Sequence, residues 1–435
     1  MTYQEEQRKA FETMFKSIRK PLNLELYVTP SCGQNCKYCY LIKHGEALYP
    51  VEIRDHEDIL NNLKKLCDFI IEKGYHFPQI EIFSGELMNN EFGHVFISLL
   101  FDKLSVKKFT DKVVIPSNFS FIGTELEKYV EEMFQAFKSI NIPVHLSCSI
   151  DGFYLDSNRK EHTRKWYDRL FKFCKYHNCG FHPMVSAIGI EKWEDNYRWW
   201  VENLTKYNIR YHNGALKIPM MLEVRDDNWT KEAIQKYISF LKYIAEYDLA
   251  NIQDRYKFAL RIFNIDHRDN IYFNKLYDII GYPKLTSGLS CGIQDRIHIR
   301  MGDLSIIPCH RTSYPEMIYG KIEGDGNVIV NNLTMALNIY SMNPNVSHPK
   351  CSDCELKYIC MKGCLGSQYE NKADIMQPCE SVCAMLHAKY MTIYDICCEN
   401  GLFDIVYQMD ISEKEKERIR YIEQILWEVK QNYKK

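Results

Sequence analysis

Three cysteines near the start of the chain have the spacing of a metal-cluster site. Cys32, Cys36 and Cys39 follow the pattern C-x3-C-x2-C. They come just after residues 22–29, in which every second residue is apolar, as in a strand with one buried face. Three close thiolates suit a [4Fe–4S] cube, because structural zinc usually takes four ligands. Such a cube leaves one iron open to a cofactor. Structural cysteines of a zinc or disulfide site are the alternative.

This stretch resembles the signature of the radical S-adenosylmethionine (radical SAM) superfamily, which has an aromatic residue before the third cysteine. Tyr38 stands at that position. The resemblance implies that the open iron binds the amino and carboxylate groups of S-adenosylmethionine. It also implies that one electron cleaves this cofactor to methionine and a 5′-deoxyadenosyl radical.

Polar motifs at the ends of the next two predicted strands resemble the parts of this family that hold the cofactor. Ser84-Gly85-Glu86 stands where the family usually has Gly-Gly-Glu, which receives the ammonium of the methionine moiety. Ser84 departs from that pattern at the first glycine. Ser117 and Asn118 follow the third strand. They are expected to hydrogen-bond the ribose or a nearby backbone group, or only to cap the loop.

The fourth predicted strand ends in a segment that resembles the Ser-x-Asp-Gly motif of peptide-modifying members. In those enzymes an arginine follows a short distance on, and Ser149 and Arg159 take the two positions here. A hydroxyl and a guanidinium suit the methionine carboxylate. Arg164 is a competing candidate, and a solvated loop charge is the alternative for Arg159.

A second group of cysteines lies near the end of the chain. Its members are Cys291, Cys309, Cys351, Cys354, Cys360, Cys364, Cys379 and Cys383. The core spacing C-x2-C-x5-C-x3-C resembles the SPASM domain, an appendage of radical SAM enzymes with two auxiliary [4Fe–4S] clusters. The resemblance implies three [4Fe–4S] clusters in all. Paired zinc ribbons are the alternative.

The resemblance also distributes these cysteines between the two auxiliary clusters. Cluster I takes Cys291, Cys309 and Cys364. Cluster II takes Cys351, Cys354 and Cys360, completed by Cys383 or Cys379. Cys383 is favoured for that position, and Cys379 is then spare or a ligand of cluster I. The family often has a further cysteine between the first two, and none stands there in this chain, so cluster I has either an open iron or a ligand of another type.

The remaining cysteines and one histidine carry different implications. Six cysteines lie within or beside predicted helices and strands and are interpreted as core residues or inert thiols: Cys67, Cys148, Cys174, Cys179, Cys397 and Cys398.

His310 directly follows Cys309, where anaerobic sulfatase maturases carry an aspartate that takes the substrate proton. That substitution makes the sulfatase-maturase reaction a weaker match.

The elements that position these motifs alternate between short apolar strands and helices. Strands are expected at 22–29, 79–83, 112–115, 144–150, 182–188 and 216–224, and helices at 55–73, 91–104, 124–140, 166–177, 191–206 and 231–247. Six such units predict a parallel sheet with right-handed crossovers. The resemblance to radical SAM enzymes implies a partial (β/α)6 barrel, and sites in such barrels form at the carboxyl ends of the strands.

The predicted fold class is therefore α/β, a radical SAM partial barrel followed by a small cysteine-rich SPASM domain and a helical C-terminal tail. The predicted boundaries are 1–21 for an N-terminal helix, 22–248 for the barrel, 249–290 for a bridging region, 291–390 for the SPASM domain and 391–435 for the tail. Regular periodicity weakens within 291–383, as expected of a small domain held together by metal.

Composition limits the compartment and the partners. Lys+Arg 55 against Asp+Glu 57 gives a net charge of −2, which provides no global field to attract nucleic acid or an anionic membrane. The chain has no apolar run of about 18 residues and no signal pattern, so a cytoplasmic location is expected. In that compartment 17 cysteines favour metal binding over disulfides.

The combined resemblance implies a peptide maturase. Such an enzyme abstracts a hydrogen from a ribosomally made precursor peptide and closes a thioether, C–C or C–O cross-link, and an auxiliary cluster accepts the second electron. The expected partners are the precursor peptide and an electron donor such as flavodoxin or ferredoxin. Residues 1–21 are too few for a leader-recognition domain, so the leader is expected to bind elsewhere on the chain or to a separate leader-peptide-binding protein.

Two other classes of function remain open from the sequence. A radical SAM dehydrogenase would oxidise a residue of a folded protein, as sulfatase maturases do, or a small alcohol. A non-enzymatic iron–sulfur electron carrier or scaffold would produce no 5′-deoxyadenosine.

Overall fold

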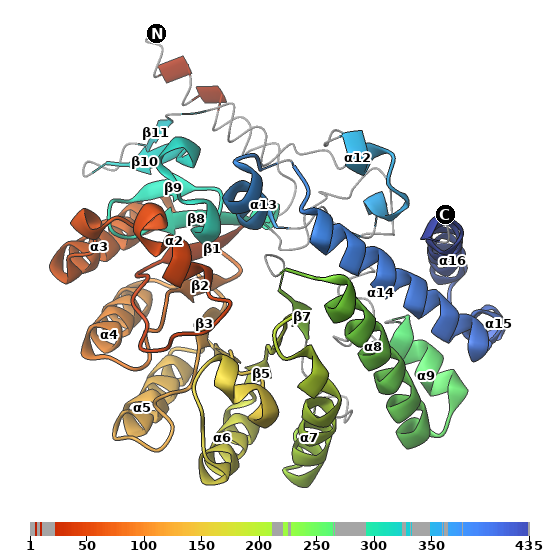
Figure 1. The fold of residues 1–435 in the computed structure, drawn as a ribbon. Helices are drawn as coiled ribbons and strands as arrows, with labels where there is room; N and C mark the ends of the chain where they lie inside the picture. Colours follow the sequence, from red (N-terminus) through yellow and green to blue (C-terminus); the bar gives the residue numbers. More distant parts are fainter. Residues whose placement is uncertain are drawn as a thin grey trace. The chain divides into compact units, whose positions relative to one another are not determined.

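The computed structural model describes the chain in two compact units (Figure 1). Unit 1 comprises Met1–Ser149, His162–Gly180 and Gly292–Ser341, and unit 2 comprises Ile150–Glu161, Phe181–Cys291 and Met342–Lys435. The described residues are 5–6, 9–10, 22–210, 221–224, 228–263, 265, 293–323, 328–330, 332, 349–358, 360, 364–375 and 377–433. Most of the predicted N-terminal helix and of the bridging region lies outside them, and the predicted domain boundaries stay predictions.

A parallel sheet is the framework of unit 1 and confirms the predicted α/β fold class. Its strands are β1 (Asn23–Tyr27), β2 (Ile80–Phe83), β3 (Val113–Ser117) and β4 (Val144–Cys148). Each pairs in parallel with the next. The helices that follow these strands are α3 (His56–Lys73), α4 (Glu91–Val106), α5 (Leu126–Ser139) and α6 (Arg164–His177). Figure 1 shows them in a row along the sheet, as the alternating sequence pattern predicts.

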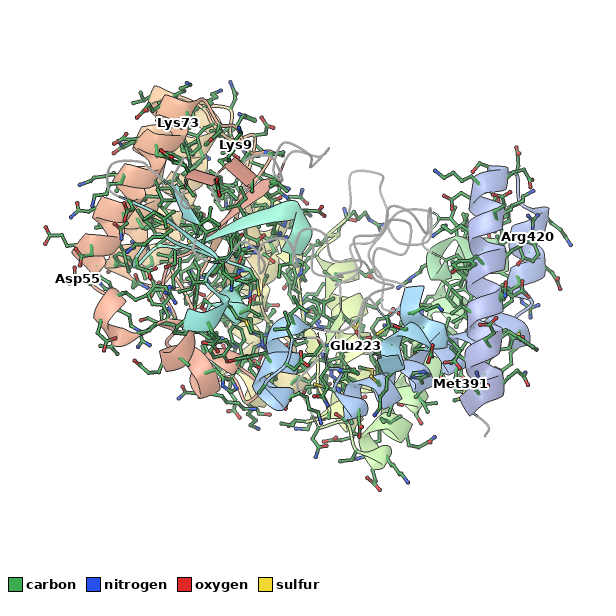
Figure 2. All side chains as sticks on the ribbon, turned by 90° about the horizontal axis from the view of Figure 1, so that it is seen from above. Lys9, Asp55, Lys73, Glu223, Met391 and Arg420 are labelled. Atoms are coloured by element: carbon green, nitrogen blue, oxygen red, sulfur yellow. The ribbon has the colours of Figure 1, made fainter. Side chains whose placement is uncertain are left out.

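Helix α3 illustrates how local sequence sets the ends of these helices. The side chain of Asp55 accepts a hydrogen bond of 3.0 Å from the backbone N–H of Asp58, which caps the first turn. Gly74 ends the helix in the left-handed conformation, with φ at +69°. Asp55 and Lys73, at the two ends, are labelled in Figure 2. The buried stripe between them is Ile59, Leu63, Leu66, Cys67 and Ile70.

Four strands that were not predicted extend the same sheet beyond β1. β8 (Arg296–Arg300) pairs in parallel with β1, and β9 (Ser305–Ile307), β10 (Gly320–Ile322) and β11 (Val328–Val330) continue it in antiparallel fashion. The sheet order is β11-β10-β9-β8-β1-β2-β3-β4-β5, with β5 at Gly180–Phe181. β9, β10 and β11 have three residues each and are too short to show a period in the sequence, which explains why this region appeared irregular.

Unit 2 is mostly helical around one apolar core. Its helices include α7 (Trp193–Lys206), α8 (Lys231–Ile252), α9 (Arg255–Ile262), α14 (Glu380–Glu399), α15 (Leu402–Gln408) and α16 (Glu413–Tyr433). Trp193, Tyr237, Ile393 and Ile422 are all buried in this core. The helices after residue 380 therefore pack with α8 in a common core, and Figure 1 shows α14 beside α8.

The fifth predicted strand is much shorter than expected. Residues 182–188 contribute only β6 (Met184–Val185), which pairs in parallel with β7 (Leu222–Glu223). Residues 216–220 of the sixth predicted strand, 216–224, lie outside the described residues. Among the residues that the structure describes, none of the helices combines the length and apolar character that a bilayer crossing requires.

Candidate functional site

The loop that leaves β1 carries the first three predicted ligands. Cys32 is exposed, Cys36 is buried and Cys39 is half-buried. The backbone N–H of Cys39 donates to the carbonyl of Cys36 at 3.0 Å. Cys39 is also the N-cap of α2 (Tyr40–Leu48).

Two N–H donors lie near the sulfur atom of Cys32. The backbone N–H of Gln34 lies 3.4 Å from Cys32 Sγ, and Asn118 Nδ2 lies 3.8 Å from the same atom. The side chain of Gln34 also bridges the loop, with Oε1 3.8 Å from Cys36 Sγ and Nε2 donating to Ser120 at 3.2 Å. Although Cys32 as a whole residue is exposed, protein atoms around its sulfur desolvate the thiol and raise its pKa, and the Gln34 N–H opposes that effect. Sulfur atoms that accept N–H bonds fit the ligands of an iron–sulfur cluster, whose potential such bonds tune.

Gly85 allows the loop after β2 to contact the cysteine loop. The backbone N–H of Gly85 donates to the carbonyl of Thr29 at 2.7 Å, and that of Glu86 donates to the carbonyl of Ser31 at 2.9 Å. A Cβ on Gly85 would lie 2.2 Å from the carbonyl oxygen of Ser31, so only glycine fits here. Ser84 is buried, and its hydroxyl has no hydrogen-bond partner in the part of the chain that the structure describes. A buried polar atom of this kind fits a ligand-binding cradle.

Glu86 brings three of the predicted residues together. Its carboxylate is buried and accepts hydrogen bonds from the Met88 N–H at 2.8 Å, the Ser117 hydroxyl at 3.1 Å and the Asn118 N–H at 2.6 Å. Burial raises the pKa of Glu86 to about 7, although these hydrogen bonds oppose the shift. The side-chain oxygen of Asn118 accepts from the Ser120 N–H at 2.9 Å. Ser117 and Asn118 thus organise the carboxylate and the loop.

We expect Glu86 to make the free energy of unfolding depend on pH. Because its pKa is raised, the Glu86 carboxyl group stays protonated up to about pH 7 in the folded chain. In the unfolded chain the same group releases its proton near pH 4.5. The stability from this group is therefore full below pH 4.5 and falls by about 3 kcal/mol as the pH rises to 7. Urea unfolding of the metal-free chain over this range, beside a Glu86→Gln variant that has no such proton, measures the loss. Parallel pH profiles for the two proteins would contradict the expectation.

The two residues predicted to bind the methionine carboxylate lie in different units. The Ser149 N–H donates to the carbonyl of Ser117 at 2.8 Å in unit 1. Arg159, in unit 2, forms an ion pair with Asp151 at 3.1 Å, and the two side chains are 11% and 0% exposed. Arg159 is therefore not a solvated loop charge. Arg164, the competing candidate, is exposed at the first turn of α6.

Six of the late cysteines line a single cavity of about 410 Å³ in unit 2. They are Cys351, Cys354, Cys360, Cys364, Cys379 and Cys383. Cys379 and Cys383 lie at the start of α14, and both contribute to the lining, so the arrangement does not separate the two candidates for the last ligand. Cys364, which the resemblance assigns to the other cluster, lines the same cavity. Cys309 lies half-buried in unit 1, and Cys291 lies outside the described residues.

These thiols are close enough to influence one another. Burial and neighbouring cysteines raise the pKa of Cys383 to about 12. The neighbours that act on it are Cys360, Cys351, Cys354 and Cys379. Metal binding takes thiolates and offsets this cost, so the donor set fits an iron–sulfur cluster. The other cysteines behave as the sequence predicts, since Cys67, Cys148, Cys174, Cys179 and Cys397 are buried and only Cys398 is exposed.

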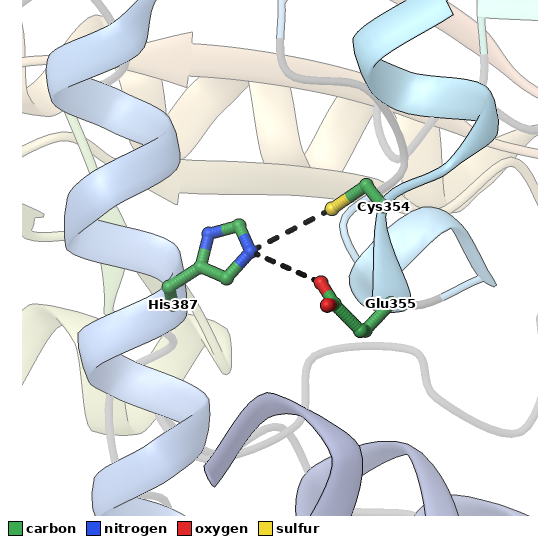
Figure 3. Close-up of side chains that lie close together, drawn as sticks. All are labelled: Cys354, Glu355 and His387. Carbon is green, nitrogen blue, oxygen red and sulfur yellow. Dashed lines mark hydrogen bonds and ion pairs between the residues drawn. The ribbon is translucent and has the colours of Figure 1, made fainter. Parts of the chain in front are cut away.

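His387, which was not among the predicted ligands, also lines this cavity. Its Nε2 lies 3.6 Å from Cys354 Sγ and 3.7 Å from a carboxylate oxygen of Glu355 (Figure 3). Cys379, Cys383 and His387 are spaced four residues apart, so they share one face of α14. That C-x3-C-x3-H spacing was the signal in the sequence.

A buried charge cluster in unit 1 was also missed, apart from His310. Glu25 on β1 pairs with Arg296 at 3.0 Å, His298 at 3.5 Å and His310 at 2.6 Å. Burial acts to raise the pKa of Glu25, but the two histidines together hold it well below its usual range. The His310 ring stacks on Phe83, with centroids 3.6 Å apart. The charges therefore fix His310, the neighbour of Cys309, against β1 and β2.

Comparisons with known proteins give a likeness of fold only. No family model matches the chain, and no curated protein is similar to it. SuiB of Streptococcus suis bound to S-adenosylmethionine is 15% identical, with a TM-score of 0.46 over 87% of this chain and 78% of SuiB. SuiB bound to the precursor peptide SuiA is 14% identical, with a TM-score of 0.44 over 87% and 79%.

Proposed function

We propose that the protein is a radical S-adenosylmethionine enzyme that matures a ribosomally made precursor peptide. One observation carries the proposal: the C-x3-C-x2-C loop after β1 is bonded, through Thr29 and Ser31, to the Gly85–Glu86 segment after β2. The cysteine loop and the Gly85–Glu86 segment lie about 50 residues apart in the sequence. They thereby meet at the carboxyl ends of neighbouring parallel strands, where barrel sites form.

The residues in this loop fit the cofactors that the motif implies. Cys32, Cys36 and Cys39 would hold a [4Fe–4S] cluster, and Ser84, Gly85 and Glu86 would lie against the methionine moiety of S-adenosylmethionine. When bound, the cluster and this cofactor supply a 5′-deoxyadenosyl radical that takes a hydrogen atom from the substrate.

The protein's own part in the reaction is to position and to shield. Glu86 fixes Ser117 and Asn118, and Asn118 in turn reaches the sulfur of Cys32. One residue, Asn118, therefore connects the Glu86 carboxylate to the cysteine loop. Such fixed geometry allows a reactive radical to meet one target carbon rather than water.

The cavity lined by six cysteines supports the oxidative part of the proposal. Thiolates gathered in one place would hold auxiliary iron–sulfur chemistry, which removes the second electron as the cross-link closes. The partners are then the precursor peptide, an electron donor such as flavodoxin or ferredoxin, and a separate leader-peptide-binding protein if the leader is not bound by this chain.

The test is to reconstitute the protein anaerobically and add dithionite, S-adenosylmethionine and the peptides encoded beside its gene. We expect 5′-deoxyadenosine and a peptide that has lost two hydrogens per cross-link, both measured by mass spectrometry. Absence of 5′-deoxyadenosine would refute the radical assignment. Formation of 5′-deoxyadenosine with oxidation of a folded protein or a small alcohol, and with no change in any peptide, would instead identify a dehydrogenase.

A further inference from the structure

We propose that Asn118 and Gln34 raise the reduction potential of the iron–sulfur cluster in the cysteine loop, by donating side-chain amide N–H groups to the sulfur atoms of Cys32 and Cys36. This inference rests on the proposed function in taking these cysteines as cluster ligands. It gives the two amides a part in the acceptance of the electron, beyond holding the loops together.

The orientation of the Asn118 amide is fixed by its own loop. The backbone N–H of Ser120 donates to Asn118 Oδ1 at 2.9 Å. A backbone N–H only donates, so the side-chain atom that faces it is the oxygen, and the amide nitrogen is on the other side. That nitrogen, Nδ2, lies 3.8 Å from Cys32 Sγ. Asn118 therefore presents an N–H donor to this sulfur, and it has no other way to satisfy Ser120.

The turn after β3 holds the Asn118 side chain in this position. Phe119, the next residue, has a φ of +59°, a left-handed conformation that is unfavourable for phenylalanine. Its ring is fully buried and packs with the rings of Phe121 and Phe173, at centroid distances of 5.2 and 6.0 Å. Burial of this ring thus stabilises the turn that directs the Asn118 amide toward Cys32.

Gln34 is suited to donate to the second sulfur. Its oxygen Oε1 lies 3.8 Å from Cys36 Sγ, and its nitrogen Nε2 donates to the Ser120 hydroxyl at 3.2 Å. That arrangement fits a thiol, which donates its hydrogen. A thiolate ligand only accepts, so the amide is expected to turn over when the cluster binds, with Nε2 toward the sulfur. Ser120 allows the exchange, because a hydroxyl that accepts from Nε2 can equally donate to Oε1.

N–H groups directed at cluster sulfur atoms favour the reduced state. Reduction adds a negative charge that is shared by the sulfur atoms, and a donor stabilises that charge more than it stabilises the oxidised cluster. Asn118 and Gln34 are each only 7% exposed, and hydrogen bonds are electrostatically stronger where water is excluded. The two amides therefore make the cluster easier for an electron donor to reduce.

The experiment is a redox titration of the anaerobically reconstituted full chain, followed by electron paramagnetic resonance. The signal that is lost when all three cysteines of the loop are alanine identifies the cluster concerned. Asn118→Leu has nearly the same shape without the donor. It should lower the equilibrium constant for reduction about tenfold, which is about 59 mV for one electron. Gln34→Leu should shift the potential in the same direction. Asn35→Leu, which removes an exposed amide from the same loop, is the control and should keep the wild-type potential.

A second variant separates the donor from the turn. Asn118→Asp keeps the oxygen that accepts from Ser120, and with it the turn, but places a carboxylate oxygen where the N–H was. Its potential should fall further than that of Asn118→Leu, because a negative charge is added as well. It also decides the question if Asn118→Leu does not fold.

A wild-type potential in Asn118→Asp, or in an Asn118→Leu protein that holds the cluster, would overturn the inference. The proposed function fails separately, by a wild-type protein that holds the cluster but forms no 5′-deoxyadenosine from S-adenosylmethionine, and the potentials still decide the present inference in that case. A wild type with no signal that depends on the three cysteines would refute both.

Discussion

Replacing Cys32, Cys36 and Cys39 together with alanine is expected to reduce reductive cleavage of S-adenosylmethionine to the level of the reagent blank. The reason is chemical: these are the three thiolates of the loop at the end of β1, and the proposed open iron exists only while they hold the cluster. No partial activity is expected, because a radical enzyme without its cluster has no other route for the electron. The measurement is 5′-deoxyadenosine per chain after anaerobic reconstitution with dithionite.

The variant should keep its fold, which makes the loss interpretable. The loop is held by backbone bonds from Gly85 to Thr29 and from Glu86 to Ser31, and none of these uses a thiol. Cys398→Ala, at an exposed cysteine near the end of α14, is the matched control and should cleave the cofactor like the wild type. Cleavage that persists in the triple variant would refute the radical assignment.

The contact between the cysteine loop and the Gly85–Glu86 segment was predictable because it depends on local sequence patterns. Alternation of apolar residues set β1 and β2, and parallel strands present their carboxyl ends at one edge of a sheet. The meeting of the Cys32 loop with Gly85 and Glu86 follows from that rule. The sequence could not show that Glu86 is buried with three hydrogen bonds. Its partners Ser117 and Asn118 lie at the end of β3, and how far the loop after β2 folds toward them is set by the three-dimensional structure.

The charge cluster around Glu25 was beyond sequence reasoning for a different reason. Its cationic partners Arg296 and His298 lie on β8, about 270 positions later, and reach Glu25 only because β8 pairs with β1. A five-residue strand in a stretch full of turn residues gives no signal for that pairing. His387 is the opposite case, since its spacing from Cys383 was visible and only the cavity gave it meaning.

Unit 2 contains a buried ion pair whose removal is expected to have the largest effect on stability. Lys389 on α14 pairs with Glu223 on β7, and each residue is 3% exposed. The hydroxyl of Tyr237 on α8 donates to the same carboxylate at 2.7 Å. Three elements that are distant in the sequence therefore meet at one carboxylate, labelled in Figure 2.

Lys389→Met should lower the free energy of unfolding of unit 2 by about 3–5 kcal/mol, because it leaves the Glu223 carboxylate buried without its cation. Adding Glu223→Gln should recover most of that loss, since the uncompensated charge is then gone. Lys236→Met, which breaks an exposed pair with Glu191 at 3.9 Å, is the control and should cost about 1 kcal/mol or less. Tryptophan fluorescence in urea reports on this unit, which holds five of the six tryptophans. If Lys389→Met cost no more than Lys236→Met, the pair would not hold α14 to β7.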